Sequence, residues 1–153
     1  MKHKKTLYGL FLFSGCALFS YLIWLSQHPV KIVAVHQERH YSDVLVNNFP
    51  LTDKGKIDWW LENKGILKEK YDIPEPDSEG NSTVSFWDFG DGYVESDGYD
   101  RLCFDDMEPP LNCINKNSLM FVMNGRNTGL SFWVDGGIYR VNKNDKRVRF
   151  DYD

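Results

Sequence analysis

Residues 85–113 hold the densest concentration of acidic side chains in the sequence, eight Asp and Glu against one basic residue, Arg101. Carboxylates at this density suit three kinds of chemistry: coordination of a hard cation, acid–base catalysis by paired carboxylates, or attraction of a basic partner. Over residues 72–108 twelve acids face one Arg, a net charge of −11, whereas residues 109–153 carry +3. The sequence therefore predicts a molecule whose charge is unevenly distributed.

Calcium binding is the first of these possibilities. Six aspartates lie near glycines, in segments that suggest turns, and aspartate oxygens are good calcium ligands. However, their order is not that of an EF-hand, whose closing glutamate is missing, and aspartate–glycine is also common turn chemistry. We expect turns rather than a metal site and predict no cofactor. A calcium-stabilised envelope module remains an alternative function.

Catalysis is the second possibility. Asp105 and Asp106 are adjacent, and adjacent side chains in a strand point to opposite faces, so they would not cooperate unless the chain bends. His36 and His40 would be about 13 Å apart in a strand, and the HExxH order is absent. We therefore do not expect an enzyme. A periplasmic hydrolase that uses carboxylates of this region remains an alternative, which predicts a solvent-filled cleft beside residues 88–106.

Recognition of a basic protein is the third possibility and the one we favour. Aromatic side chains are interleaved with the carboxylates and would supply anchors for a partner. The candidate partner-binding residues are Asp88, Asp91, Tyr93, Asp97, Tyr99, Asp100, Asp105 and Asp106. Nucleic acid is not expected as a partner, because it is itself negatively charged. The competing interpretation is a solvated surface that only maintains solubility.

Segment 7–25, which has 19 residues and no charge, indicates in which compartment the acidic region lies. As a helix it would span about 28 Å, the thickness of the bilayer core. Lys2, Lys4 and Lys5 precede it, which favours a cytoplasmic N-terminus. We predict a cytoplasmic tail (1–6), a single transmembrane anchor (7–25) in a bacterial inner membrane, and a periplasmic domain (30–153).

Two other interpretations of this segment are a cleaved signal peptide and a lipoprotein signal. A cleaved signal peptide has a shorter apolar core than this one. A lipoprotein signal, suggested by LFSGC ending at Cys16, would normally turn polar directly after the cysteine, whereas here the apolar run continues. We expect an uncleaved anchor, and the sequence leaves lipidation of Cys16 open.

Cys103 and Cys113 lie in the domain that the topology places in an oxidising compartment. An even pair of cysteines there predicts a disulfide, which would contribute about 2.5–3 kcal/mol through the entropy of the unfolded chain. Two buried free thiols are the alternative.

The remaining pattern predicts an α+β domain in which one helix packs on a small antiparallel sheet of five or six strands. Residues 30–37 read as the first strand, and 41–50 are ambiguous between helix and strand. Residues 52–73 have the clearest helical pattern, with Thr52 as the N-cap. Its apolar face comprises Ile57, Trp60, Leu61, Leu67 and Tyr71. Beyond residue 81, short β-rich runs alternate with turn residues.

Several segments, KIVAVHQ (31–37), YSDVLVNNFPLTDKGKIDWWL (41–61), YDIP (71–74), WDFGDGY (87–93) and YDRLCFDDM (99–107), together resemble an uncharacterised family of small enterobacterial inner-membrane proteins. The resemblance covers nearly the whole chain and implies a single-pass membrane protein. It carries no site residues. By analogy of size and location, it suggests an immunity or envelope accessory protein that neutralises a toxin or joins a complex.

Overall fold

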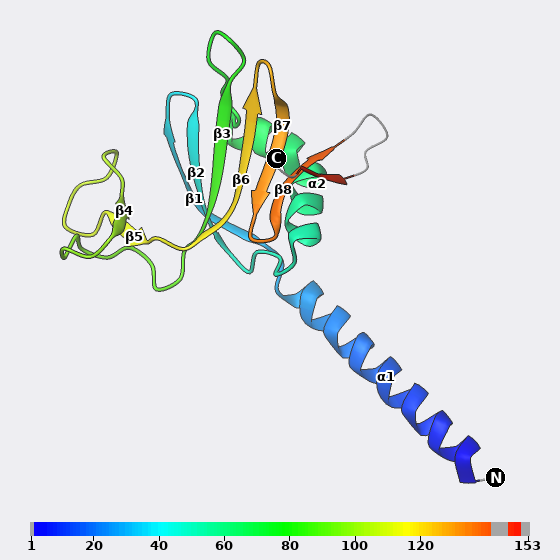
Figure 1. Ribbon diagram of the computed structural model, residues 1–153. Helices are drawn as coiled ribbons and strands as arrows, with labels where there is room; N and C mark the ends of the chain where they lie inside the picture. Colours follow the sequence, from blue (N-terminus) through cyan, green and yellow to red (C-terminus); the bar gives the residue numbers. More distant parts are fainter. Residues whose placement is uncertain (1, 142–146, 151–153) are drawn as a thin grey trace.

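The computed structural model describes residues 2–141 and 147–150, and consists of a long helix that projects from an α+β domain (Figure 1). The elements are α1 (Lys2–Gln27), β1 (Lys31–Glu38), β2 (Tyr41–Asn47), α2 (Asp53–Tyr71), β3 (Ser82–Asp88), β4 (Arg101–Cys103), β5 (Cys113–Asn115), β6 (Ser118–Gly125), β7 (Gly129–Val134), β8 (Gly137–Val141) and β9 (Arg147–Phe150). The predicted fold class is confirmed.

Helix α1 is continuous through the predicted anchor, and it includes residues 2–6 as well. Within the described residues, Lys2–Trp24 is the one helical segment long and apolar enough to cross a membrane. Its side chains are exposed rather than packed on the domain.

The main sheet has the strand order β1-β2-β3-β6-β7-β8-β9. Its neighbouring strands are antiparallel except for β2 and β3, which are parallel and joined through α2. The prediction of a purely antiparallel sheet was wrong here, because the ambiguous segment 41–50 forms a strand and a helical crossover returns the chain parallel to it. The sequence predicts five or six strands, whereas the described residues form nine. The run YVE contributes only an isolated bridge between Val94 and Cys113.

The main core lies between α2 and one face of this sheet. Successive side chains of a strand alternate between the two faces, so Val44 and Val46 on β2 and Phe86 on β3 point toward α2 and are fully buried. Trp60 of α2 packs edge-on against Phe86, with ring centroids 6.0 Å apart. Burial of each such side chain contributes about 1.5–3 kcal/mol.

Helix α2 has the ends and the apolar face that the sequence predicts. Thr52 is its N-cap, and the Oγ1 of this residue accepts a hydrogen bond of 3.0 Å from the backbone N–H of Gly55. Ile57, Trp60 and Leu67 are buried. The helix therefore packs on the sheet through its predicted face.

Residues 89–117, which we call the acidic lobe, leave the main sheet after β3 and return to it at β6 (Figure 1). Strands β4 and β5 pair within the lobe, and the predicted disulfide Cys103–Cys113 joins them. A second, smaller core cluster packs Phe104 and Ile114 of the lobe against Leu45 of β2. The lobe is thus fixed to the sheet face opposite α2.

Candidate functional site

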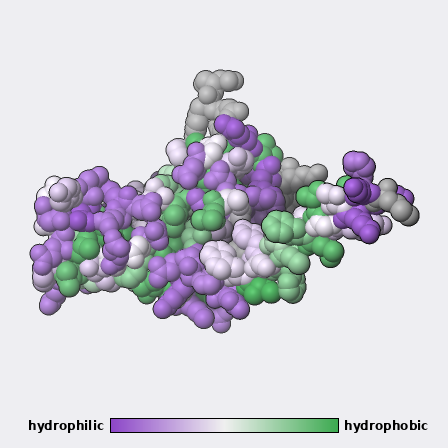
Figure 2. All heavy atoms as spheres, turned by 90° about the horizontal axis from the view of Figure 1, so that it is seen from below, coloured by the Kyte–Doolittle hydropathy of each residue, from purple (hydrophilic) through white to green (hydrophobic). Residues whose placement is uncertain are grey.

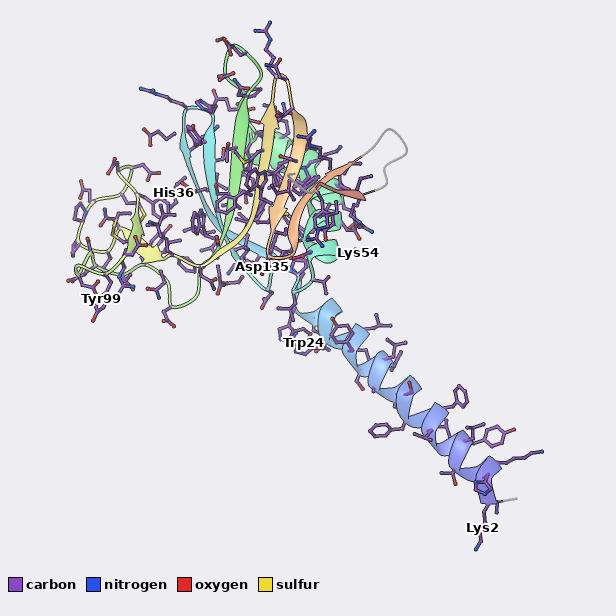
Figure 3. The ribbon with its side chains drawn as sticks, in the orientation of Figure 1. Lys2, Trp24, His36, Lys54, Tyr99 and Asp135 are labelled. Atoms are coloured by element: carbon purple, nitrogen blue, oxygen red, sulfur yellow. A yellow bond between two sulfur atoms is a disulfide. The ribbon has the colours of Figure 1, made fainter. Side chains whose placement is uncertain are left out.

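His36 on β1 connects the acidic lobe to the main sheet. Its Nδ1 lies 2.9 and 2.8 Å from the two carboxylate oxygens of Asp106, and its Nε2 lies 2.9 Å from the Tyr93 hydroxyl. Both partners belong to the lobe, 70 and 57 residues away along the chain. Figure 3 shows His36 at the edge of the sheet that faces the lobe.

The contacts of the imidazole assign its protons. A carboxylate only accepts hydrogen bonds, so Nδ1 carries a proton, and in the neutral ring Nε2 accepts a hydrogen bond from the Tyr93 hydroxyl. The ring also stacks on Phe104, with centroids 3.8 Å apart and planes 12° from parallel. With both nitrogens occupied and one face covered, His36 has a single well-defined orientation.

A cleft of about 460 Å³ opens beside this histidine, between the β1–β2 hairpin and the lobe. It is lined by His36, Gln37, Glu38, Asp43, Leu102, Cys103, Phe104, Asp105 and Asp106. Asp105 and Asp106 both line it because they lie in a turn, so the expectation that they point to opposite faces of a strand was wrong. Four carboxylates and one imidazole therefore share one solvent-filled space.

Asp43 is a partly buried carboxylate of the cleft. It lies directly across the hairpin from His36 and accepts a hydrogen bond of 2.8 Å from Trp87 Nε1. Partial burial raises the pKa of Asp43, while the bond from Trp87 and the proximity of His36 oppose this rise. Asp43 therefore holds a proton to higher pH than an exposed aspartate.

Tyr93 is perturbed in the same direction. Removal from water raises the pKa of its hydroxyl, and the charge of Asp106 raises it further. The hydroxyl therefore stays protonated and suits the role of hydrogen-bond donor to His36 rather than that of a nucleophile.

Besides Asp106, two more of the predicted partner-binding aspartates are paired within the protein. Asp97 accepts two hydrogen bonds from Arg101, at 3.0 and 2.9 Å, and the pKa of Asp97 is lowered chiefly by these bonds. Asp100 lies 2.8 Å from the ammonium of Lys116. These carboxylates stabilise the lobe internally as well as contributing to its charge.

Asp88 lies where the chain leaves β3 and enters the lobe, not within the lobe itself. It is half-buried at the end of β3 and accepts a hydrogen bond of 3.4 Å from the side chain of Asn117.

Other side chains of the lobe remain available to a partner. Tyr99 is 75% exposed, and the Arg101 guanidinium lies 5.8 Å from the centre of its ring. Within the lobe, the exposed carboxylates that make no hydrogen bond or ion pair with any described residue are Asp91, Glu95, Asp105 and Glu108.

The structure divides the acidic run of the sequence into two places. Residues 72–81 precede β3 and residues 89–117 follow it, so they lie at opposite ends of that strand. Seven acids of the lobe face Arg101 and Lys116, which leaves the lobe a net charge of −5. Seen from the side on which α1 projects, the lobe is predominantly hydrophilic (Figure 2).

The calcium alternative would need several oxygen ligands gathered around one point. Across residues 2–141 and 147–150, no three His, Cys, Asp or Glu side chains are grouped closely enough to hold a metal ion. The lobe aspartates instead bind Arg101, Lys116, His36 and backbone amides of their own turns.

Sequence reasoning missed His36 and Asp43 as site residues. Their contacts with the lobe join segments that are far apart in the chain, so no local spacing reveals them. One signal was present: the turn at residues 39–40 pairs His36 with Asp43 if the flanking strands form a hairpin. The ambiguity of 41–50 concealed it.

Comparison with known proteins gives one match, to a family model described as "Enterobacterial putative membrane protein (DUF943)", over residues 1–151. No curated protein and no solved structure matches the chain. The match extends from the apolar helix through the sheet and the acidic lobe, so it includes both parts of the molecule. The chain therefore belongs to this enterobacterial family, DUF943.

Proposed function

We propose that this protein is a membrane-anchored recognition protein of the bacterial inner membrane, whose acidic lobe binds a basic protein partner in the periplasm. The observation that carries the proposal is the set of four unpaired, exposed carboxylates held on a lobe that a disulfide closes. Charges on a rigid surface attract an oppositely charged partner and raise its association rate.

Two further features support binding at this surface. Tyr99 offers an exposed aromatic ring, a residue type that often anchors protein interfaces. The lysines before the apolar helix favour retention of that end in the cytoplasm, which would leave the domain in the oxidising periplasm where a disulfide persists. An immunity protein or an envelope accessory factor would need both properties.

The test is in-cell crosslinking followed by purification of the full-length tagged protein. The test variant combines Asp91→Asn, Glu95→Gln, Asp105→Asn and Glu108→Gln, which removes charge without removing any hydrogen bond or ion pair among the described residues. We expect one stoichiometric partner with the native protein, and loss of that partner with the variant.

A matched control tests whether the position of the charge matters. Glu62→Gln with Glu69→Gln neutralises two exposed carboxylates of α2, and it is compared with Glu95→Gln and Glu108→Gln in the lobe. Recognition by the lobe predicts weaker binding and a shallower salt dependence for the lobe pair alone. Equal binding by all variants would refute the proposal.

A hydrolase is the second candidate, because the cleft that this alternative requires is present beside the lobe. In it, Asp43 with its raised pKa would supply a proton, and His36 could act as a base only through Nε2, after releasing the Tyr93 hydroxyl. Assay of the purified protein against chromogenic esters, phosphates and glycosides, beside an Asp43→Asn variant, tests this candidate. Absence of turnover that depends on Asp43 would remove it.

A further inference from the structure

A groove of about 430 Å³ lies where α1 meets the domain, and its walls come from both parts. Tyr21 and Trp24 line it from the helix, while Phe49, Pro50 and Leu51 line it from the connection between β2 and α2. Figure 3 shows Trp24 near the end of α1 that adjoins the domain.

Leu51 is the feature that requires explanation. It is 84% exposed, the highest value among the exposed large hydrophobic side chains of the described residues. Exposure of so large an apolar side chain is unfavourable in water, and here it lies beside the end of an apolar helix rather than on a remote surface.

The connection between the two parts is short. Only residues 28–30 separate Gln27 at the end of α1 from Lys31 at the start of β1. Three residues span at most about 10 Å, so the domain cannot move far from the end of the helix. In the structure, the β2–α2 connection lies beside Tyr21 and Trp24, and all of them line one groove.

The ring positions indicate what surrounds this connection. Tyr21 and Trp24 stack with centroids 6.5 Å apart, near the end of the segment long and apolar enough to cross a membrane. Tyr and Trp at the ends of such segments lie among the lipid headgroups. A loop that shares a groove with these rings lies at the same depth.

We propose that residues 48–52 form a membrane-contacting loop, in which Leu51 inserts into the headgroup region of the bilayer beside Tyr21 and Trp24. The occupant of the groove is lipid, because the groove is continuous with the lipid-facing surface of α1. Lys31 flanks the loop through its pairing with Asn47, and its exposed ammonium can bond the phosphate groups of lipids. This contact holds the domain against the membrane by one edge and so fixes the direction in which the acidic lobe faces.

The test measures membrane depth in the full-length protein in nanodiscs of phosphatidylethanolamine and phosphatidylglycerol. Cys16→Ser removes the free cysteine, and Leu51→Cys then provides a single site for an NBD label while the Cys103–Cys113 disulfide stays closed. Leu111→Cys is the matched control, an exposed leucine of the acidic lobe. Quenching by lipids with a doxyl group in the headgroup region or upper acyl chain reports contact with the bilayer.

The label at residue 51 should show blue-shifted emission and strong loss of intensity with the quencher lipids, whereas the label at residue 111 should show neither. A label at 51 that is as solvent-exposed as that at 111 would overturn the proposal. Equal quenching at both positions would also overturn it, because contact would then not be specific to the 48–52 loop. Both results are independent of whether the lobe binds a protein.

Discussion

Replacement of His36 by Phe should loosen the acidic lobe while leaving the main sheet intact. The substitution keeps an aromatic ring that can stack on Phe104, but it removes the hydrogen bonds to Asp106 and Tyr93. These bonds join β1 to the lobe, which otherwise depends on a small core cluster and its own disulfide. The perturbation therefore isolates the polar connection.

The magnitude follows from the two bonds. A hydrogen bond to a charged group contributes about 1.5–3 kcal/mol and a neutral one about 0.5–1 kcal/mol. The Asp106 side chain is 54% exposed, so solvent screening reduces its contribution to about 1–2 kcal/mol. The total expected for His36→Phe is about 1.5–3 kcal/mol in the free energy of opening the lobe.

Hydrogen exchange of the full-length protein measures this quantity locally. The amides of β4 and β5 should exchange about 10- to 150-fold faster in the variant, because each 1.4 kcal/mol is a factor of ten, while those of β3 and β6 should change little. His40→Phe is the matched control, since the His40 ring contacts Tyr41 rather than the lobe.

A double-mutant cycle gives the decisive number. His36→Phe combined with Asp106→Ala should show a coupling energy of about 1–2 kcal/mol, because both changes remove the same bond. Coupling below about 0.3 kcal/mol would mean that the two residues act independently. The interpretation of His36 as the polar connection between lobe and sheet would then be wrong.

Three other predictions test the fold and its ionisable groups. Leu67→Ala should destabilise the domain by about 2–5 kcal/mol in denaturant unfolding, whereas Ile66→Ala, at an adjacent position that is half exposed, should have little effect. Asp43→Asn should raise the melting temperature near neutral pH, because the raised pKa of Asp43 means that its ionisation opposes folding, while Asn can still accept the bond from Trp87. The stability that protonated Asp43 contributes is complete below its ordinary pKa of 3.8 and is lost as pH rises through the pKa of the folded state. The difference in melting temperature between variant and native protein should therefore disappear in acid. Replacement of both lobe cysteines by serine should cost about 2.5–3 kcal/mol and accelerate hydrogen exchange in the lobe first, and unchanged exchange there would show that the disulfide does not fix the lobe.

The sequence determined the features that depend on neighbours in the chain. Local periodicity and capping residues predicted the apolar run 7–25, the helix that begins after Thr52 and the short strands with their turns. The pairing of Cys103 with Cys113 was predictable too, because only two cysteines lie beyond the apolar helix.

The tertiary structure alone decided what these elements bring together. The parallel pairing of β2 with β3, the separation of the acidic run into two ends of a strand, and the contact of His36 with Asp106 all depend on how distant segments pack. A residue's own neighbours carry no information about a partner 70 positions away. Burial and long-range contact arise only when the core forms, so the cleft beside the lobe became visible in the fold and not in the sequence.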